Sequence, residues 1–191
     1  MLIVSMFTPN TPYEKEMDRL TKSLDVLEIE YVATPIHQMH DWAFNCGQNA
    51  RTIYENMVKF NDDILYLDAD AEMRQQPKLF NELECDIAIH RIQYPEREEL
   101  EYCTGTLFCR NNQKVKEFLN VWAKMNNVHS DDQINFRTLY ESSDIDLYDL
   151  PQEYCFIIGN RIHKKKIGCK PVIVHHQASR KWKNNIYGRN Y

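Results

Sequence analysis

The stretch DDILYLDADAEM, at residues 62–73, decides the fold class of this chain. Residues 64–67 within it are wholly apolar, which is typical of a short buried strand in a parallel sheet. Asp68 and Asp70 follow where that strand ends, and alternation along an extended chain places their side chains on the same side. Ligands of open α/β sheets bind beyond the carboxyl ends of the strands, so this position suits chemistry.

Two carboxylates held this close together are costly unless a cation lies near them. We therefore expect a divalent metal site at Asp68 and Asp70. The plain alternative is an acidic turn after a strand, because aspartate is a favoured turn residue. The run by itself does not decide between these two interpretations.

The residues before this stretch predict a strand–helix–strand unit. Residues 2–7 are apolar and predict the first strand, and residues 30–36 predict the second. Between them, Thr11-Pro12-Tyr13-Glu14 has the form of a helix start, so a helix should run to about residue 27. No G-x-G-x-x-G follows the first strand, which argues against a dinucleotide fold and a P-loop.

A second helix is predicted from Asn45 or Gly47 to Phe60, after a loop at residues 37–46. Arg51 lies in its first half. Most arginines on helices are solvated, but one that points at the strand edge could hold a phosphate.

The second half of the chain continues the alternation of strands and helices. Strands are expected at residues 85–90, 102–109, 145–150 and 170–176, a short helix at 77–83, a charged surface loop at 94–101, and two longer helices beginning at Asn112 and near Ser130. Gly105 lies inside one of these strands, where a glycine often marks a bulge or the close approach of a ligand. The whole pattern predicts an α/β fold with a mixed, mainly parallel sheet flanked by helices.

Length and composition are those of one globular domain. The 191 residues are 43% hydrophobic and 27% charged, and no apolar run approaches the roughly 20 residues of a membrane span. Residues 1–7 lack the basic start of a signal peptide. The six cysteines form no C-x-x-C pair, which favours reduced thiols in a cytoplasmic protein.

Charge is distributed very unevenly along the chain. All 28 acidic residues lie at or before Glu153, whereas residues 154–191 carry nine lysines or arginines and no acid. A basic segment of this kind suggests an anionic partner, although it could simply offset the acidic body. A compact phosphate ligand agrees better with an acidic metal site than nucleic acid does.

Two histidines end the last predicted strand much as the two aspartates end the earlier one. His175 and His176 both follow the apolar residues 172–174, and the sequence leaves open which of them is the ligand. Two carboxylates, one imidazole and the oxygens of a diphosphate would complete a roughly octahedral sphere for Mn²⁺ or Mg²⁺. The imidazole favours Mn²⁺.

With these motifs in this order, the chain resembles glycosyltransferases of the GT-A fold, which use nucleotide-sugar donors. The resemblance covers nearly the whole chain and rests on Asp68-Ala69-Asp70, Thr104-Gly105-Thr106-Leu107, Asp132-Gln133, and Val174-His175 with Lys181. They resemble, respectively, the D-x-D metal signature, the N-x-G-hydrophobic segment, the Asp-Gln motif, and the terminal histidine and lysine of glycogenin-like enzymes. The length also resembles that of small viral and bacterial GT-A enzymes of the nucleotide-diphospho-sugar transferase kind.

The resemblance implies a single GT-A domain over residues 1–191 with a basic tail from about residue 177. It implies metal-dependent transfer of a sugar, most readily from a UDP-sugar, to a glycan, lipid-linked or protein acceptor that the sequence does not identify. The implied metal ligands are Asp68, Asp70 and His175, and the implied donor contacts are Ser5, Phe7, Thr8, Arg51, Asp68, Ala69, Gly105 and Lys181. Asp132 and Gln133 would lie at the sugar, with Asp132 as the base if the enzyme inverts.

Two features depart from the glycogenin-like pattern. Ala178 stands where a glycine is expected after the histidine, and Lys181-Trp182 replaces Lys-Pro-Trp. Two other functions compete with this one. An aspartate-nucleophile phosphatase also has a strand followed by D-x-D, but normally on its first strand. A non-catalytic sugar or nucleic-acid binding module would explain the basic tail and leave the paired aspartates unexplained.

Overall fold

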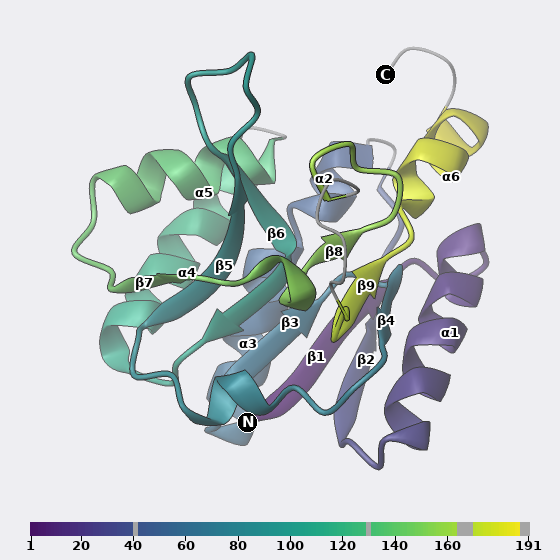
Figure 1. Cartoon of the computed structure of the whole chain (residues 1–191), viewed down its shortest axis with the longest axis horizontal. Helices are drawn as coiled ribbons and strands as arrows, with labels where there is room; N and C mark the ends of the chain where they lie inside the picture. Colours follow the sequence, from purple (N-terminus) through teal and green to yellow (C-terminus); the bar gives the residue numbers. More distant parts are fainter. Residues whose placement is uncertain (40–41, 129–130, 164–169, 188–191) are drawn as a thin grey trace.

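A six-stranded mixed sheet forms the centre of the molecule, and a second sheet of three strands lies beside it (Figure 1). The structure is a computed structural model of the chain, and it describes residues 1–39, 42–128, 131–163 and 170–187. Strand order is β2-β1-β3-β6-β5-β7 in the large sheet and β4-β9-β8 in the small one. Within the described residues, no helix is long and apolar enough to cross a membrane.

The elements follow one another in the order strand, helix, strand that the sequence predicts for the first part. They are β1 (Leu2–Phe7), α1 (Pro12–Val26), β2 (Tyr31–Pro35), α2 (Trp42–Cys46), α3 (Asn49–Phe60), β3 (Ile64–Leu67), β4 (Ala71–Met73), η1 (Lys78–Asn81), β5 (Ile87–Ile92), β6 (Glu101–Cys109), α4 (Gln113–Asn126), α5 (Asp132–Glu141), β7 (Leu147–Asp149), η2 (Gln152–Tyr154), β8 (Phe156–Ile157), β9 (Ile173–His175) and α6 (Ala178–Tyr187).

The large sheet is mainly parallel, with one reversed strand. β1 runs parallel to β2 and β3, and β5 runs parallel to β7, while β6 is antiparallel to both of its neighbours. The pairing of β5 with β6 shifts register between Ile89 and His90. These strands meet the expectation of a mixed, mainly parallel α/β sheet.

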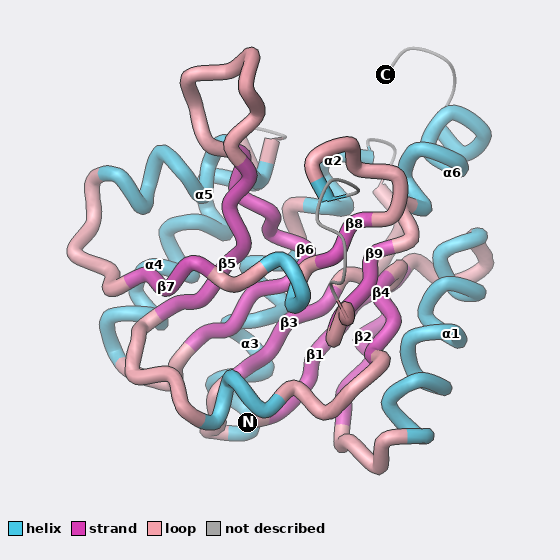
Figure 2. The backbone as a smooth tube through the Cα atoms, viewed as in Figure 1, coloured by secondary structure: helices cyan, strands magenta, loops and turns pink. Residues whose placement is uncertain are grey.

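Two apolar cores cover the two faces of this sheet. On one face, side chains from β1, β3, β5 and β6 pack against Ile53 and Met57 of α3, Trp122 of α4 and Phe136 of α5. On the other face, Leu65 and its neighbours pack against α1 and against strands β4 and β9 of the small sheet. Strands β1, β3, β5 and β6 each contribute side chains to both cores, because successive side chains point to opposite faces. Figure 2 shows the helices gathered around the strands.

The helix expected from Asn45 or Gly47 to Phe60 is instead two helices, α2 and α3. Gly47 lies between them, and its carbonyl oxygen accepts a hydrogen bond from Asn126 Nδ2 at 3.0 Å. A Cβ at Gly47 would lie 3.0 Å from the Cβ of Asn126. The break therefore lets the chain pack closely against the end of α4, and the expected loop at residues 37–46 contains a short helix.

Residues 178–187 form the helix α6 where the sequence suggested only a basic tail. α6 follows β9, and Trp182 Nε1 donates a hydrogen bond to Glu16 Oε1 of α1 at 3.4 Å. The helix α5 begins after Asp131, whose side chain accepts a hydrogen bond from the Ile134 backbone nitrogen. Ser130, the first residue of the predicted cap, lies outside the described residues.

Candidate active site

The turn that carries Asp68 and Asp70 joins the two sheets. Asp68 follows β3 of the large sheet, and its backbone nitrogen donates to the carbonyl oxygen of Gly105 at 2.8 Å. The backbone nitrogen of Ala71 then donates to the carbonyl oxygen of Asp68 at 2.9 Å, which closes the turn into β4. The carboxylates therefore lie in the connection between the central strand β3 of the large sheet and β4 of the small one.

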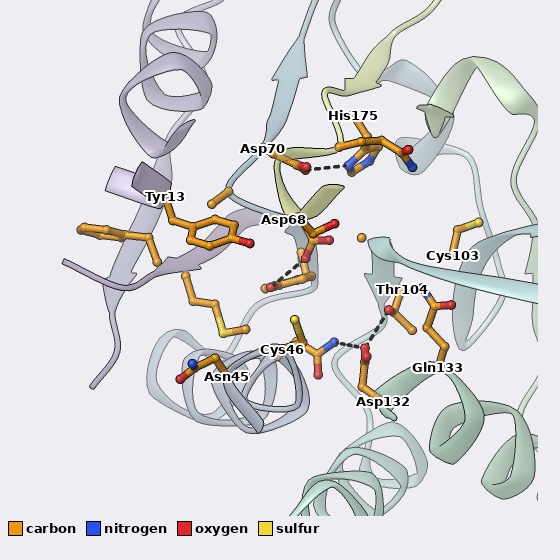
Figure 3. Close-up of a pocket in the computed structure, with 18 of the residues that line it drawn as sticks. Tyr13, Asn45, Cys46, Asp68, Asp70, Cys103, Thr104, Asp132, Gln133 and His175 are labelled. Atoms are coloured by element: carbon orange, nitrogen blue, oxygen red, sulfur yellow. Dashed lines mark hydrogen bonds and ion pairs between the residues drawn. The ribbon is translucent and has the colours of Figure 1, made fainter. Parts of the chain in front are cut away.

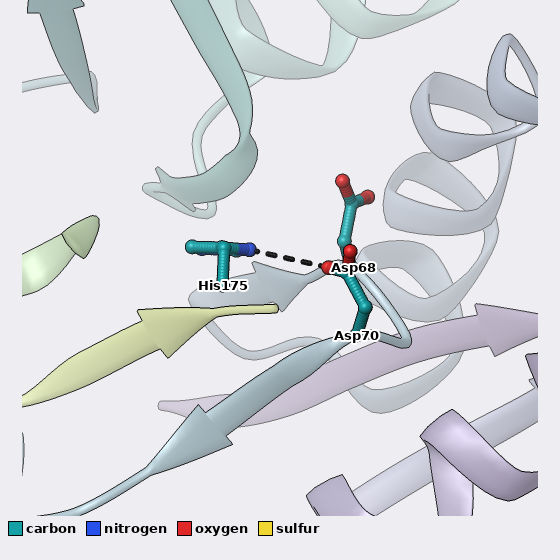
Figure 4. Close-up of side chains that lie close together, drawn as sticks. All are labelled: Asp68, Asp70 and His175. Carbon is teal, nitrogen blue, oxygen red and sulfur yellow. Dashed lines mark ion pairs between the residues drawn. The ribbon is translucent and has the colours of Figure 1, made fainter. Parts of the chain in front are cut away.

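Pairing of β4 with β9 brings a histidine to these two acids. Ala71 is opposite His175 in that ladder, and the ligand atoms of Asp68, Asp70 and His175 all lie within 4.8 Å of one another (Figure 4). His175 Nδ1 is 3.5 Å from Asp70 Oδ1. His176 Nε2 instead lies 2.7 Å from Glu72 Oε2. Of the two candidate histidines, the structure therefore directs His175 to the aspartates.

The two aspartates have opposite electrostatic environments. Burial, together with the neighbouring Asp70, raises the pKa of Asp68 to about 7. For Asp70, burial alone would raise the pKa, but hydrogen bonding and charge from His175 outweigh it, so the pKa is lowered. The backbone nitrogen of Ala178, at the start of α6, also donates to Asp70 Oδ2 at 2.7 Å. Asp70 is thus the acid that is readily ionised.

Several observations fit this cluster to a divalent cation. Two carboxylates and one imidazole are donors that suit Mn²⁺ or Mg²⁺. A cation would relieve the repulsion between the acids that helps to raise the pKa of Asp68. A Cβ at Gly105 would lie 2.7 Å from Asp68 Oδ2 and 3.2 Å from His175 Cε1. The glycine therefore leaves room at the centre of the cluster that any side chain would fill.

The far side of the His175 ring is also held. Thr106 Oγ1 lies 2.7 Å from His175 Nε2, and both residues are buried. Because Nε2 is engaged there, Nδ1 is the nitrogen that faces Asp70. Partners of this kind orient metal-binding imidazoles in proteins and fix their tautomer.

A third carboxylate lies across the pocket from this cluster (Figure 3). Asp132 is the first residue of α5, and its Oδ2 accepts hydrogen bonds from Asn49 Nδ2 at 2.9 Å and from Thr104 Oγ1 at 2.8 Å. Burial raises the pKa of Asp132, while the two hydrogen bonds oppose that rise. In the described part of the chain no lysine or arginine forms an ion pair with it.

The pocket between these acids has a volume of about 230 Å³. One end is aromatic: it contains Tyr13, whose Oη accepts a hydrogen bond from Trp42 Nε1 at 3.1 Å, and Phe7 also lines the pocket (Figure 3). Toward the other end lie Cys103 and Gln133 (Figure 3). The pocket could therefore bind a ligand that has a planar ring at one end and a polar, flexible group at the other. The middle of this ligand would lie near the acids.

Most residues singled out from the sequence come together here. The pocket is lined by Phe7, Thr8, Asp68, Ala69, Asp70, Gly105, Asp132, Gln133 and His175. Ser5 does not line it: this residue is buried within β1, beside Ala33 of β2.

Two of the basic residues also lie elsewhere. Arg51, a candidate phosphate contact, does not line the pocket: its guanidinium is exposed and lies 2.7 Å from Glu55 on the same helix. Asn49, two residues earlier, faces the pocket instead, and two residues turn a helix by about 200°. Lys181 is exposed on α6, with its ammonium 4.2 Å from the centre of the Trp182 ring.

Sequence reasoning missed several polar or aromatic residues of the pocket, among them Asn49, Tyr13 and Thr104. Asn49 shares a face of α3 with Ile53 and Met57 at spacings of four residues, so a polar residue on a buried stripe was the available signal. Tyr13 lies in the first turn of a helix, where the sequence pattern indicates only the helix start. Thr104 gives no signal apart from its position beside Gly105.

The chain has the GT-A arrangement of glycosyltransferases, with an Asp-x-Asp turn after a central strand. A structure of a glycosyltransferase involved in the glycosylation of the major capsid of PBCV-1 is similar over 98% of both chains, at 15% identity and a TM-score of 0.70. The galactosyltransferase LgtC, in complex with donor and acceptor sugar analogs, matches 98% of this chain and 94% of its own, at 12% identity and a TM-score of 0.58.

Longer proteins share the same fold. The glycosyltransferase GlyE of Streptococcus pneumoniae TIGR4 matches 91% of this chain at 17% identity and a TM-score of 0.59, and this chain spans about half, 54%, of its length. No curated protein matches the sequence.

Residues 27–184 match the family model described as nucleotide-diphospho-sugar transferase. The chain therefore belongs to that family of enzymes, which transfer sugars from nucleotide-sugar donors.

Proposed function

We propose that this protein is a single-domain, metal-dependent glycosyltransferase that moves a sugar from a UDP-sugar to an acceptor hydroxyl. The observation that carries the proposal is the convergence of Asp68, Asp70 and His175 at one side of a pocket that has Asp132 on its other side. Membership of the nucleotide-diphospho-sugar transferase family supports the donor class. The phosphatase alternative has no such support, and the D-x-D turn follows the third strand of the chain, not the first.

The metal would be held by Asp68, Asp70 and His175, with Mn²⁺ preferred over Mg²⁺ because one ligand is an imidazole. When bound, such an ion supplies Lewis-acid stabilisation of the charge that develops on the diphosphate leaving group. Asp70 is ready to hold the ion, because its lowered pKa keeps the carboxylate ionised. Asp68 must give up its proton first, because its pKa lies at about 7 in the metal-free site.

The aromatic end of the pocket suits the nucleoside of the donor. Phe7 and Tyr13 offer apolar faces for a base, and the Thr8 hydroxyl lies beside them. Ala69 and Gly105 carry little or no side chain, so the backbone around them can approach the ribose and the diphosphate closely. A pyrimidine such as uracil is the smaller base and suits the modest volume of about 230 Å³.

The other end of the pocket suits the transferred sugar. Asp132 and Gln133 supply a carboxylate and an amide that can hydrogen-bond to hydroxyl groups. If the reaction inverts the sugar, Asp132 is the candidate base, because burial raises its pKa toward the range of a general base.

Lys181 lies on α6, which begins at the nitrogen that contacts Asp70. We expect this helix to move its lysine toward the phosphates when the donor binds, because the described residues that line the pocket include acids but no lysine or arginine. A reducing compartment such as the cytoplasm is supported by the five described cysteines, all of which are free thiols.

The experiment that tests the proposal measures release of UDP from UDP-glucose, UDP-galactose and UDP-N-acetylglucosamine, with Mn²⁺ and with EDTA. We expect at least one donor to be turned over with Mn²⁺ and none with EDTA. No acceptor is needed, because water takes the sugar slowly when none is present. The Asp70→Asn variant should abolish turnover while its far-UV circular dichroism stays unchanged. Equal turnover with Mn²⁺ and EDTA would refute the metal-dependent mechanism.

A further inference from the structure

Three elements that are distant in sequence converge on the carboxylate of Asp132. Asn49 comes from α3, Thr104 from β6, and Asp132 itself begins α5. Both partners donate to the same oxygen, Oδ2, at 2.9 and 2.8 Å (Figure 3). The carbonyl oxygen of Asp132 accepts a further hydrogen bond from Trp122 Nε1 of α4 at 3.0 Å. The side chain and the peptide of this residue are therefore both fixed.

The two donors are themselves held in place. Asn49 is 2% exposed and Thr104 is 4% exposed, so neither exchanges its partner readily for water. Asn49 Oδ1 accepts a hydrogen bond from the backbone nitrogen of Ala50 at 2.6 Å. That contact sets the orientation of the amide, because it directs Nδ2 toward Asp132. A threonine hydroxyl beside an ionised carboxylate can only donate.

The other oxygen of Asp132 is left for a ligand. Asp132 lines the pocket, and within the described residues its Oδ1 has no hydrogen bond to another residue. Two donors on one oxygen prevent the carboxylate from rotating about its terminal bond. A misplacement of about 1 Å at such a group can lower a rate by roughly 10²-fold.

We propose that Asn49 and Thr104 are positioning residues, which hold Asp132 so that Oδ1 points at the sugar of the bound donor. This inference rests on the proposed function, because it needs a sugar at that end of the pocket. Among the described residues, no hydrogen bond joins Asn49 or Thr104 to the metal cluster, so their loss should change the chemical step more than the affinity for the nucleotide.

The charge around Asp132 makes the same pair visible in a pH profile. Acidic neighbours oppose its ionisation: Asp131 lies beside it on α5 and Asp68 lies on the turn after β3, and the phenol of Tyr66 on β3 is also nearby. The described contacts from α3, β6 and α4 are the neutral groups of Asn49, Thr104 and Trp122. Removing either side-chain donor should therefore raise the pKa of Asp132 further.

The test compares Thr104→Val with Thr104→Ser in the full-length protein. Valine keeps the shape and loses the hydroxyl, so kcat for UDP release with Mn²⁺ should fall on the order of 10²-fold. The Kd for UDP with Mn²⁺ should stay within about twofold, because nucleotide binding does not use Asp132. The acidic limb of the kcat profile should move to higher pH, and serine should restore both kcat and the limb.

Asn49→Ala should behave like Thr104→Val, and it provides the same test if the valine variant fails to fold. Matched controls come from the same helix, α3: Thr52→Val removes a buried hydroxyl that contacts Met6 Sδ at 3.5 Å, and Asn56→Ala removes a buried amide that bonds the Thr52 carbonyl oxygen. Neither control residue lines the pocket, and both variants should keep the kcat of the wild type.

The outcomes separate this inference from the function on which it rests. If the wild-type protein turns over a UDP-sugar and both Asn49→Ala and Thr104→Val keep its kcat and pH profile, the positioning role is wrong and the proposed function stands. If kcat falls equally in the Thr52→Val and Asn56→Ala controls, the effect is general destabilisation and the inference is also overturned. A wild type that neither turns over a UDP-sugar nor binds UDP with Mn²⁺ overturns both.

Discussion

At the scale of single residues, the site depends on small groups that leave room and on hydroxyls that orient larger ones. Gly105 leaves space between Asp68 and His175, and Thr106 holds the imidazole from its far side. The sequence identified the glycine and the charged residues, because these types carry recognisable chemistry. Thr104 and Thr106 were named only as part of the motif around Gly105 and received no role, since a hydroxyl in a strand usually has only a structural role.

Thr106→Val should weaken metal binding without unfolding the protein. The variant removes the contact at His175 Nε2, so the ring loses its fixed orientation and tautomer. Loss of such a partner typically costs about 10- to 100-fold in metal affinity. Titration calorimetry with Mn²⁺ in the presence of UDP measures the change. Thr52→Val is the control, and equal Mn²⁺ affinity in both variants and the wild type would contradict the assigned role.

The raised pKa of Asp68 predicts how stability depends on pH. Its folded-state pKa of about 7 lies above the ordinary value of 3.8. A group of this kind favours the folded state fully below pH 3.8 and less and less as the pH rises to about 7. The metal-free protein should therefore lose stability relative to Asp68→Asn over this window, and Mn²⁺ should restore it near neutral pH.

Urea unfolding with EDTA at several pH values between 4 and 8 provides the measurement. The Asp68→Asn variant removes the titrating group, so the difference in free energy of unfolding between wild type and variant should change with pH in the direction given. A difference that is constant across this window would show that Asp68 does not titrate as described.

At the scale of elements, local signals predicted which segments are strands and helices, and long-range contacts decided the rest. The Pro12 helix start and the apolar residues of β3 were evident because caps and burial patterns are local. The break between α2 and α3 was not, because Gly47 packs against Asn126, which is 79 residues away. Likewise, only the register of β4 and β9 distinguishes His175 from His176.

The helix α6 is the element with the most direct link to ligand binding. Its first backbone nitrogen donates to Asp70 Oδ2, and Trp182 contacts Glu16 of α1. We expect the metal to compete with the Ala178 backbone nitrogen for Asp70. We expect the phosphates of the donor to attract the basic helix, whose movement would exclude water from the reaction. Hydrogen exchange of residues 177–185 should slow when UDP and Mn²⁺ are added together.

UDP with EDTA serves as the control for that measurement, because the nucleotide alone lacks the metal that bridges it to Asp70. If hydrogen exchange of these residues is unchanged when both ligands are added, α6 does not close over the bound donor. That result would leave the metal site itself untouched.

At the scale of the whole molecule, the site lies where two sheets meet. The acidic and the basic residues near it come from different parts of the chain. The acids of the site come from residues 68–70 and 132, while the basic helix α6 follows the last strand. The sequence predicted the mixed sheet, the D-x-D turn and the contribution of the C-terminal histidine. The small sheet β4-β9-β8, which brings the histidine to the aspartates, required the three-dimensional structure.

Thermal unfolding with UDP tests whether a divalent metal links a nucleoside diphosphate to Asp68, Asp70 and His175. UDP at about 100 times its Kd should stabilise the protein by roughly 2.7 kcal/mol with Mn²⁺ and by far less with EDTA. The Asp70→Asn variant should lose the Mn²⁺-dependent part. An equal shift for UDP with Mn²⁺ and with EDTA would contradict the account.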